Sequence, residues 1–262
     1  MSAPLYLVEA FADAPFTGNP AGVCLPAGDP DARWMQHVAG DMNQAETAFV
    51  RPRADGDWDL RWFTPTVEVD LCGHATLAAA HVLWEAGRAT GAVRFHTKSG
   101  VLTCNAVGGY IEMDFPAEPA SPATDLGELA LVLGATPTFL GRNRMDVLAV
   151  LPLAADVRDL KPDLAQLANV PARGVIVTAP GDLDGIDFVS RFFAPRSGVS
   201  EDPVTGSAHC CLGPYWRGML GKNELIGYQA SSRGGTVRVR CAGDRVILAG
   251  RAITLVEGVL KV

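Results

Sequence analysis

The chain of 262 residues is 48% hydrophobic and 19% charged, and its formal net charge is −7. This composition is typical of a protein with a sizeable core, in one large domain or two smaller ones, and excludes a disordered chain. Because the 22 basic residues form no run, a nucleic-acid-binding protein is not expected. No apolar stretch approaches the roughly 20 residues that cross a bilayer, and the first residues lack the pattern of a secretion signal.

The cysteine pattern favours a cytoplasmic protein. Six cysteines are present, but they form no CxxC pair and have no histidine pair at zinc-ligand spacing. The adjacent Cys210 and Cys211 are poorly placed for a disulfide with each other. We therefore expect reduced, mostly buried thiols and no metal.

In chain order, the first half reads as strands with few helices. Asp31 is a candidate N-cap for a helix that places Trp34, Val38 and Met42 on one face. A turn is expected at 16–20. Strands are expected over 5–11, 21–25, 45–50, 60–63, 93–96 and 110–113.

Two segments read as helices without a polar face. Residues 74–86 are apolar on nearly every side, and residues 207–220 are similar, although Gly213 and Pro214 should kink the second helix. A helix of this kind is normally buried all round. A strongly curved sheet wrapped about one helix would bury it in this way.

An internal repeat divides the chain into halves. The sequence RWFTP at 61–65 returns as RFFAP at 191–195, an offset of 130. The sequence GHA at 73–75 returns as GSA at 206–208, an offset of 133. Matched landmarks in the same order indicate duplication of one unit that mixes strands and helices.

The proline-rich segment 116–122 is the expected link between the halves, because it is unsuited to the interior of a strand or helix. We predict an N-terminal half-domain over residues 1–118, which a C-terminal strand over 250–262 would complete. A C-terminal half-domain is predicted over 123–249.

A glycine stands directly before each central helix, at Gly73 before His74 and at Gly206 before Ser207. Glycine lets a ligand approach the backbone closely, and the N–H groups of the first helical turn have no intrahelical partner. In a pseudo-twofold arrangement the two helix starts should face each other across a cleft and bind anionic groups there.

Three ionisable residues accompany these helix starts: His74, Asp202 and Glu46. Strand alternation places Glu46 on the same apolar face as Val50, where loss of hydration should raise its pKa. A carboxyl group in that condition suits general acid/base chemistry. The offset of 130 places Ile176 opposite Glu46 in the other half, so the acid is present once.

Five motifs stand in order along the chain: DAPFTGNPA at 13–21, MNQAETAF at 42–49, RWFTP at 61–65, DLCGHA at 70–75 and EDPVTGSA at 201–208. With these motifs the chain resembles the PhzF-like (phenazine biosynthesis) isomerase family over nearly its full length. The resemblance implies a diaminopimelate epimerase-like α+β fold of two pseudo-symmetric half-domains, each a curled sheet around a central helix. It also implies an active site without metal or cofactor, a small-molecule carboxylate substrate and a homodimer.

The resemblance also implies roles for single residues. In phenazine-pathway members the reaction is the isomerisation of a dihydro-hydroxyanthranilate. The glutamate that matches Glu46 relays the hydrogen, and the residues that match His74 and Asp202 orient the substrate and share protons. The predicted substrate-binding residues are Asn19, Cys72, Gly73, Gly206 and Ser207.

Two other functions stay open on the sequence. Related epimerases use two thiols, one from each half, and Cys72 occupies the first position, but the second half offers Asp202 and Pro203 there. Cys210 and Cys211 lie inside the second helix pattern and do not supply the missing thiol. The alternatives are an epimerase or racemase that uses Cys72, and a non-catalytic protein that binds a metabolite or partner.

Overall fold

A computed structural model describes residues 2–126 and 128–261, which divide into two compact units. The first unit comprises residues 2–114 and 249–261, and the second comprises residues 115–248. Strand β8 (Tyr110–Pro116) leads from the first unit into the second, and β17 (Arg245–Gly250) leads back. No helix in the described part of the chain has the length and apolar character that a bilayer crossing requires.

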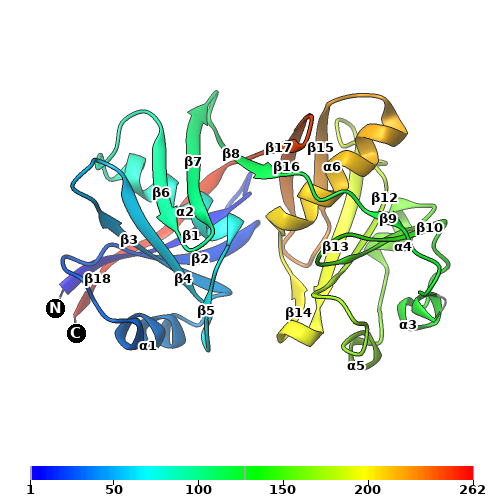
Figure 1. Ribbon diagram of the computed structural model, residues 1–262, viewed down its shortest axis with the longest axis horizontal. Helices are drawn as coiled ribbons and strands as arrows, with labels where there is room; N and C mark the ends of the chain where they lie inside the picture. Colours follow the sequence, from blue (N-terminus) through cyan, green and yellow to red (C-terminus); the bar gives the residue numbers. More distant parts are fainter. Residues whose placement is uncertain (1, 127, 262) are drawn as a thin grey trace. The chain divides into compact units, whose positions relative to one another are not determined.

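The first unit is a curved sheet around helix α2 (Gly73–Glu85), as Figure 1 shows. Strand β1 pairs antiparallel with β2 and β18, β2 runs parallel to β3, and β3 pairs antiparallel with β4. From β4 the sheet continues parallel to β6 and then antiparallel through β7 and β8, while the short β5 also pairs with β4. The strands are β1 (Ser2–Ala10), β2 (Asn19–Cys24), β3 (Glu46–Pro52), β4 (Trp58–Phe63), β5 (Glu68–Val69), β6 (Val93–Thr97), β7 (Gly100–Val107) and β18 (Ala252–Lys261).

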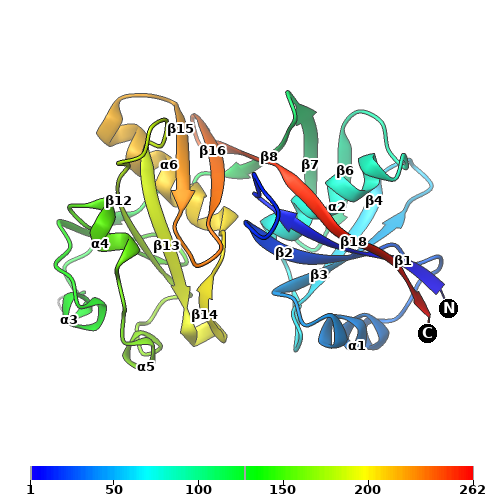
Figure 2. The same cartoon turned by 180° about the vertical axis from the view of Figure 1, so that it is seen from behind.

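The second unit repeats this order of pairings around its own central helix, α6 (Gly206–Leu220) (Figure 2). Strands β10 and β11 are antiparallel, β11 and β12 parallel, and β12 and β13 antiparallel; β13 then pairs with β14 and, in parallel, with β15, which pairs with β16. Each direction matches the first unit, so the predicted pair of pseudo-symmetric sheets is confirmed. The strands are β9 (Ser121–Pro122), β10 (Phe139–Arg142), β11 (Val147–Val150), β12 (Val175–Pro180), β13 (Phe188–Ala194), β14 (Val199–Asp202), β15 (Glu224–Gln229) and β16 (Gly235–Ala242).

Both central helices are buried because they lack a polar face. In α2 the side chains from His74 to Ala80 are all buried, and in α6 the buried side chains include Cys211, Leu212 and Trp216. Small side chains on α2 let the strands approach the helix axis closely, and the apolar area removed from water stabilises the arrangement.

A second helical layer covers the outer face of each sheet. In the first unit this layer is α1 (Ala32–Met42), which Asp31 caps by accepting the Trp34 N–H at 2.8 Å, as predicted. The predicted face of α1 packs against the sheet, since Val38 is buried and Trp34 and Met42 are partly buried against the same cluster. The buried Met35 and Ala39 widen this face. In the second unit the layer consists of α3 (Leu129–Leu133), α4 (Ala154–Arg158) and α5 (Leu164–Leu167).

Two helical layers explain why β3 does not alternate between buried and exposed side chains. Residues 47–50 are all buried, as is usual for a strand covered on both faces. Phe49 packs in the cluster that contains α1. Because alternate side chains point to opposite faces, Glu46 and Val50 project towards the face of α2.

Pro214 lies inside α6 without ending the helix. A proline has no N–H, so the Cys210 carbonyl, four residues earlier, loses its usual donor. The Glu118 N–H donates to that carbonyl at 3.0 Å instead. Gly213 gives the helix room against β16, since a Cβ atom at this position would lie 2.7 Å from Val239 Cγ1. The helix is continuous from Gly206 to Leu220, and the kink expected at Gly213 and Pro214 stays a prediction.

Two glycines of α6 provide a matched test of this packing. Gly213→Ala should lower the free energy of unfolding by about 1–3 kcal/mol, because the new methyl group overpacks the contact with Val239. Gly218→Ala should raise it by roughly 0.5–1 kcal/mol, because position 218 is exposed with open space around it and alanine favours the helix. Urea denaturation measures both changes, and equal effects of the two variants would contradict the close approach.

Candidate active site

Predicted site residues of the first unit meet at the start of α2. Asn19 is the first residue of β2 and Glu46 the first residue of β3. Because β2 and β3 run parallel, these two residues lie at the same edge of the sheet. Cys72 is the N-cap of α2 and His74 its second residue, so the helix start lies at this edge too.

The imidazole of His74 is the centre of this cluster. Its Nδ1 lies 3.3 Å from Asn19 Nδ2, and its Nε2 lies 3.3 Å from Glu46 Oε2. The residue is only 6% exposed, and burial lowers the pKa of His74 to about 4, so the ring is neutral near neutral pH. If the Asn19 amide donates to Nδ1, the ring proton is on Nε2, the nitrogen that lies 3.3 Å from the Glu46 carboxylate.

Cys72 also lies beside the Nδ1 atom of this ring. Its side chain is buried, and its Sγ atom is 3.5 Å from His74 Nδ1. Its carbonyl accepts hydrogen bonds from the Thr76 N–H at 3.2 Å and the Thr76 hydroxyl at 2.6 Å. The backbone of the helix start is therefore firmly held.

In the second unit, Asp202 is tied to the N-cap of α6. The Thr205 hydroxyl donates to Asp202 Oδ2. The buried Gln229 amide accepts the Thr205 N–H at 2.9 Å and donates to the Asp202 carbonyl at 2.7 Å. His209, fully buried one turn later, donates from Nδ1 to the Thr205 carbonyl at 2.8 Å. These bonds fix the half-buried Asp202 at the end of β14 beside the helix start.

Ser207, the second residue of α6, has a charged neighbour. Arg173 Nη2 donates to Ser207 Oγ at 2.9 Å and to Asp146 Oδ2 at 2.5 Å, and Arg173 Nε donates to Asp146 Oδ1 at 2.9 Å. The Asp146 side chain has no exposed surface, and that of Arg173 is 37% exposed. Neither Asp146 nor Arg173 is a site residue predicted from the sequence. The signal in the sequence is a charged side chain shortly before each of the apolar strands β11 and β12.

The first turns of α2 and α6 have backbone donors available for an anion. Among the described residues no side chain caps either helix, whereas Asp31 caps α1 and Asp163 caps α5. Neither first turn contains an acidic residue. Unsatisfied N–H groups at a helix N-terminus favour a carboxylate or phosphate.

The structure corrects two alignments between the repeats. Thr47 pairs with Phe63 and Val175 with Phe193, so the counterpart of Glu46 is Gly174 and not the predicted Ile176. The constant offset fails because the connection between β12 and β13 is two residues longer than that between β3 and β4.

The second correction concerns the thiol position. The N-caps Cys72 and Thr205 occupy equivalent places, so the counterpart of Cys72 is Thr205 and not Asp202 or Pro203. The second unit still has no thiol at that place. Burial raises the pKa of Cys210 and of Cys211 to about 12, which makes both thiols poor bases near neutral pH.

Within residues 2–126 and 128–261, two groups of side chains have the spacing of metal ligands. The ligand atoms of Glu46, Cys72 and His74 lie within 4.8 Å of one another, as do those of Asp55, Asp57 and His96. In the second group His96 Nε2 contacts Asp57 Oδ2 at 2.8 Å, which is an ordinary surface pair. The expectation of a metal-free site stays a prediction.

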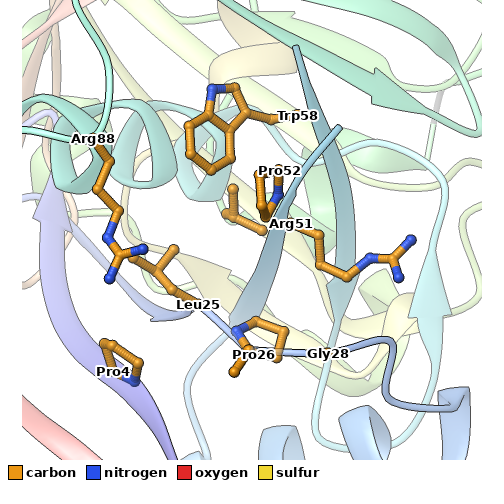
Figure 3. A pocket seen from close by; sticks show the side chains of 10 residues that line it. Pro4, Leu25, Pro26, Gly28, Arg51, Pro52, Trp58 and Arg88 are labelled. Carbon is orange, nitrogen blue, oxygen red and sulfur yellow. The ribbon is translucent and has the colours of Figure 1, made fainter. Parts of the chain in front are cut away.

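A cavity of about 400 Å³ lies elsewhere in the first unit. It adjoins the loop after the C-terminal end of α2, where the helix dipole disfavours anions. Figure 3 shows Arg51 and Arg88 with their guanidinium groups well apart, so they do not form one anion cradle. Its lining residues include Pro4, Leu25, Pro26, Arg51, Trp58 and Arg88.

Comparison with known proteins identifies the family. The model of the phenazine biosynthesis-like protein family matches residues 8–258. The chain belongs to this PhzF family. An uncharacterised isomerase of Halalkalibacterium halodurans is 49% identical, over 99% of each chain. A crystal structure of a PhzF family protein from Enterococcus faecalis superposes with a TM-score of 0.95 at 39% identity, over 100% of each chain.

More distant structures share the fold alone. A hydroxyproline epimerase from Agrobacterium vitis superposes with a TM-score of 0.63 at 11% identity, over 99% of this chain and 92% of the other. Together with the PhzF structures, this similarity confirms the predicted diaminopimelate epimerase-like fold. PhzF relatives carry the name isomerase, which agrees with the family predicted from the motifs.

The buried histidines predict how stability depends on pH. Burial lowers the pKa of both His74 and His209 to about 4 from the ordinary value of 6.5. Between these values the unfolded chain binds more protons, so stability is full above about pH 6.5 and falls as the pH approaches 4. Each histidine should contribute a slope of roughly 1.4 kcal/mol per pH unit across this range.

Urea denaturation at several pH values measures this slope. His74→Gln and His209→Gln should each reduce it by the contribution of one histidine, whatever their effect on stability at pH 7. A slope that stays the same in both variants would show that folding lowers the pKa of neither histidine.

Proposed function

We propose that this protein is a cofactor-independent isomerase that transfers a proton between two carbon atoms of a small carboxylate-bearing metabolite. The observation that carries the proposal is the contact of 3.3 Å between Glu46 Oε2 and Nε2 of the buried, neutral His74. This pair lies at a helix start whose backbone donors are suited to an anion. Membership of a family whose members are named isomerases supports the same class of reaction.

In this mechanism Glu46 is the general acid/base. Its carboxylate takes a proton from one carbon of the substrate and returns it to another carbon on the same face, so the electron pair shifts within the substrate and no redox change occurs. The Glu46 side chain is 20% exposed, which shields the proton in transit from most of the solvent. His74 is a neutral neighbour whose Nε2 lies 3.3 Å from Glu46 Oε2, and Asp202 is assigned to orient the substrate and share protons.

The epimerase alternative needs a second base. The 3.5 Å contact between Cys72 Sγ and His74 Nδ1 favours some reactivity of the thiol. Inversion of a carbon centre requires groups on both faces, and the counterpart of Cys72 is the hydroxyl of Thr205. That hydroxyl is a donor to Asp202 and is a far weaker base than a thiolate. These contacts support transfer on one face through Glu46.

Glu46→Gln is the direct test. The amide has nearly the same shape but cannot carry the proton, so turnover should fall at least about 100-fold while the melting temperature changes little. The assay incubates the protein in deuterated water with a set of small carboxylates and follows isomerised products and deuterium on carbon by mass spectrometry. Glu224→Gln, at an exposed position, is the matched control. Full activity of the Glu46 variant would remove this residue from the mechanism.

Cys72→Ser separates the two mechanisms. Under the proposal the serine keeps a small polar side chain beside His74, and turnover should fall by less than about tenfold, since the thiol carries no proton in the reaction. The same mass-spectrometric assay, combined with chiral separation of the product, gives the measurement. Deuterium at an inverted stereocentre, lost in the Cys72 variant, would instead establish the epimerase.

A further inference from the structure

The Asp146–Arg173 ion pair has no counterpart in the first unit. The repeats share another pair, Arg61–Glu68 in the first and Arg191–Glu201 in the second, and its presence in both indicates a role in the fold. By contrast, the pairing registers place Ala21 and Ala45 at the positions that correspond to Asp146 and Arg173. The additional pair therefore serves something that only the second unit has.

Burial of Asp146 makes this pair expensive to maintain. Its carboxylate is removed from water completely, and a buried charge destabilises a protein unless it is paired and hydrogen-bonded. Two parallel hydrogen bonds from Arg173 meet that need and hold the guanidinium in one orientation. The Arg173 guanidinium also lies over the Phe192 ring, with its Cζ atom 5.4 Å from the ring centre, and this contact restrains it further.

The fixed guanidinium determines how the Ser207 hydroxyl bonds. Arginine can only donate, so Ser207 Oγ must be the acceptor of the 2.9 Å bond from Nη2. The hydroxyl proton of Ser207 must then point away from Arg173. Ser207 is half-buried in the uncapped first turn of α6, where backbone N–H donors are also present.

We propose that Asp146 and Arg173 are positioning residues that turn the Ser207 hydroxyl into a pre-oriented donor for the carboxylate of the substrate. Asp146 fixes Arg173, Arg173 occupies the acceptor side of Ser207, and the hydroxyl proton completes the set of donors at the start of α6. The inference rests on the proposed function in taking the anion to be part of the substrate. The Ser207 hydroxyl thus adds one donor for the substrate carboxylate at the start of α6, and neither Arg173 nor Asp146 contacts that carboxylate directly.

Calorimetric titration of the full chain with 2-aminobenzoate, and with the neutral 2-aminobenzamide for comparison, tests this arrangement. The native protein should prefer the carboxylate, and Ser207→Ala should bind it about tenfold more weakly, the effect of losing one hydrogen bond to a charged group. Arg173→Gln should show a similar loss, and Arg173→Lys, which keeps one donor for Ser207, a smaller one. The variant with both Ser207→Ala and Arg173→Gln should bind no more weakly than Ser207→Ala alone.

Arg173→Gln leaves the Asp146 charge buried without its partner, so Asp146→Asn combined with Arg173→Gln is the folded control. This neutral pair should show the same loss of affinity. Additive losses in the double variant at 173 and 207 would show that Arg173 contacts the anion itself, and would overturn the proposal. Native affinity in the neutral pair, or no preference of the native protein for the carboxylate over the amide, would also overturn it. Because the readout is binding, failure of the proton transfer through Glu46 would leave this result intact.

Discussion

The buried start of each central helix is the constraint on which the rest of the structure depends. A helix that begins inside a curved sheet presents backbone N–H groups that must find an acceptor, because a buried donor without a partner is costly. In α1 a side chain supplies that acceptor, and in α2 and α6 none of the described side chains caps the helix. The two glycine-led turns thus combine a structural need with backbone donors of the kind that suit an anion.

The two units use the same frame for different chemistry. At the second position of the central helix, the first unit has His74 and the second has Ser207. Where the first unit has Glu46, the second has Gly174, and a Cβ atom there would lie 2.3 Å from the ring of Phe192. The place that the Glu46 side chain would take in the second unit is thus occupied by the Phe192 ring. Because the repeats diverge at this position, only the first unit has an acidic side chain there.

Much of this organisation is predictable from sequence, because apolar helices and repeated motifs are strong local signals. The expected helices at 74–86 and 207–220 differ from α2 and α6 by one residue at most at each end. The residue-by-residue alignment of the repeats is harder to predict. The loop between β12 and β13 is two residues longer than that between β3 and β4, so the counterpart of Glu46 is Gly174 and not Ile176. The contact between Arg173 and Asp146 is not predictable from the sequence, because they are 27 positions apart and only the parallel pairing of β11 with β12 brings them together. Asn19 and Glu46 likewise meet through the pairing of β2 with β3.

Pro214 shows how a residue that is unfavourable within an element can connect neighbouring parts of a chain. By withholding an N–H from the Cys210 carbonyl, it leaves an acceptor inside the domain that the Glu118 backbone occupies. An alanine at 214 would bring its own N–H to the same oxygen, which would then be shared between two donors. Proline leaves this oxygen to the Glu118 N–H, so that the segment entering the second unit has a defined anchorage on its central helix.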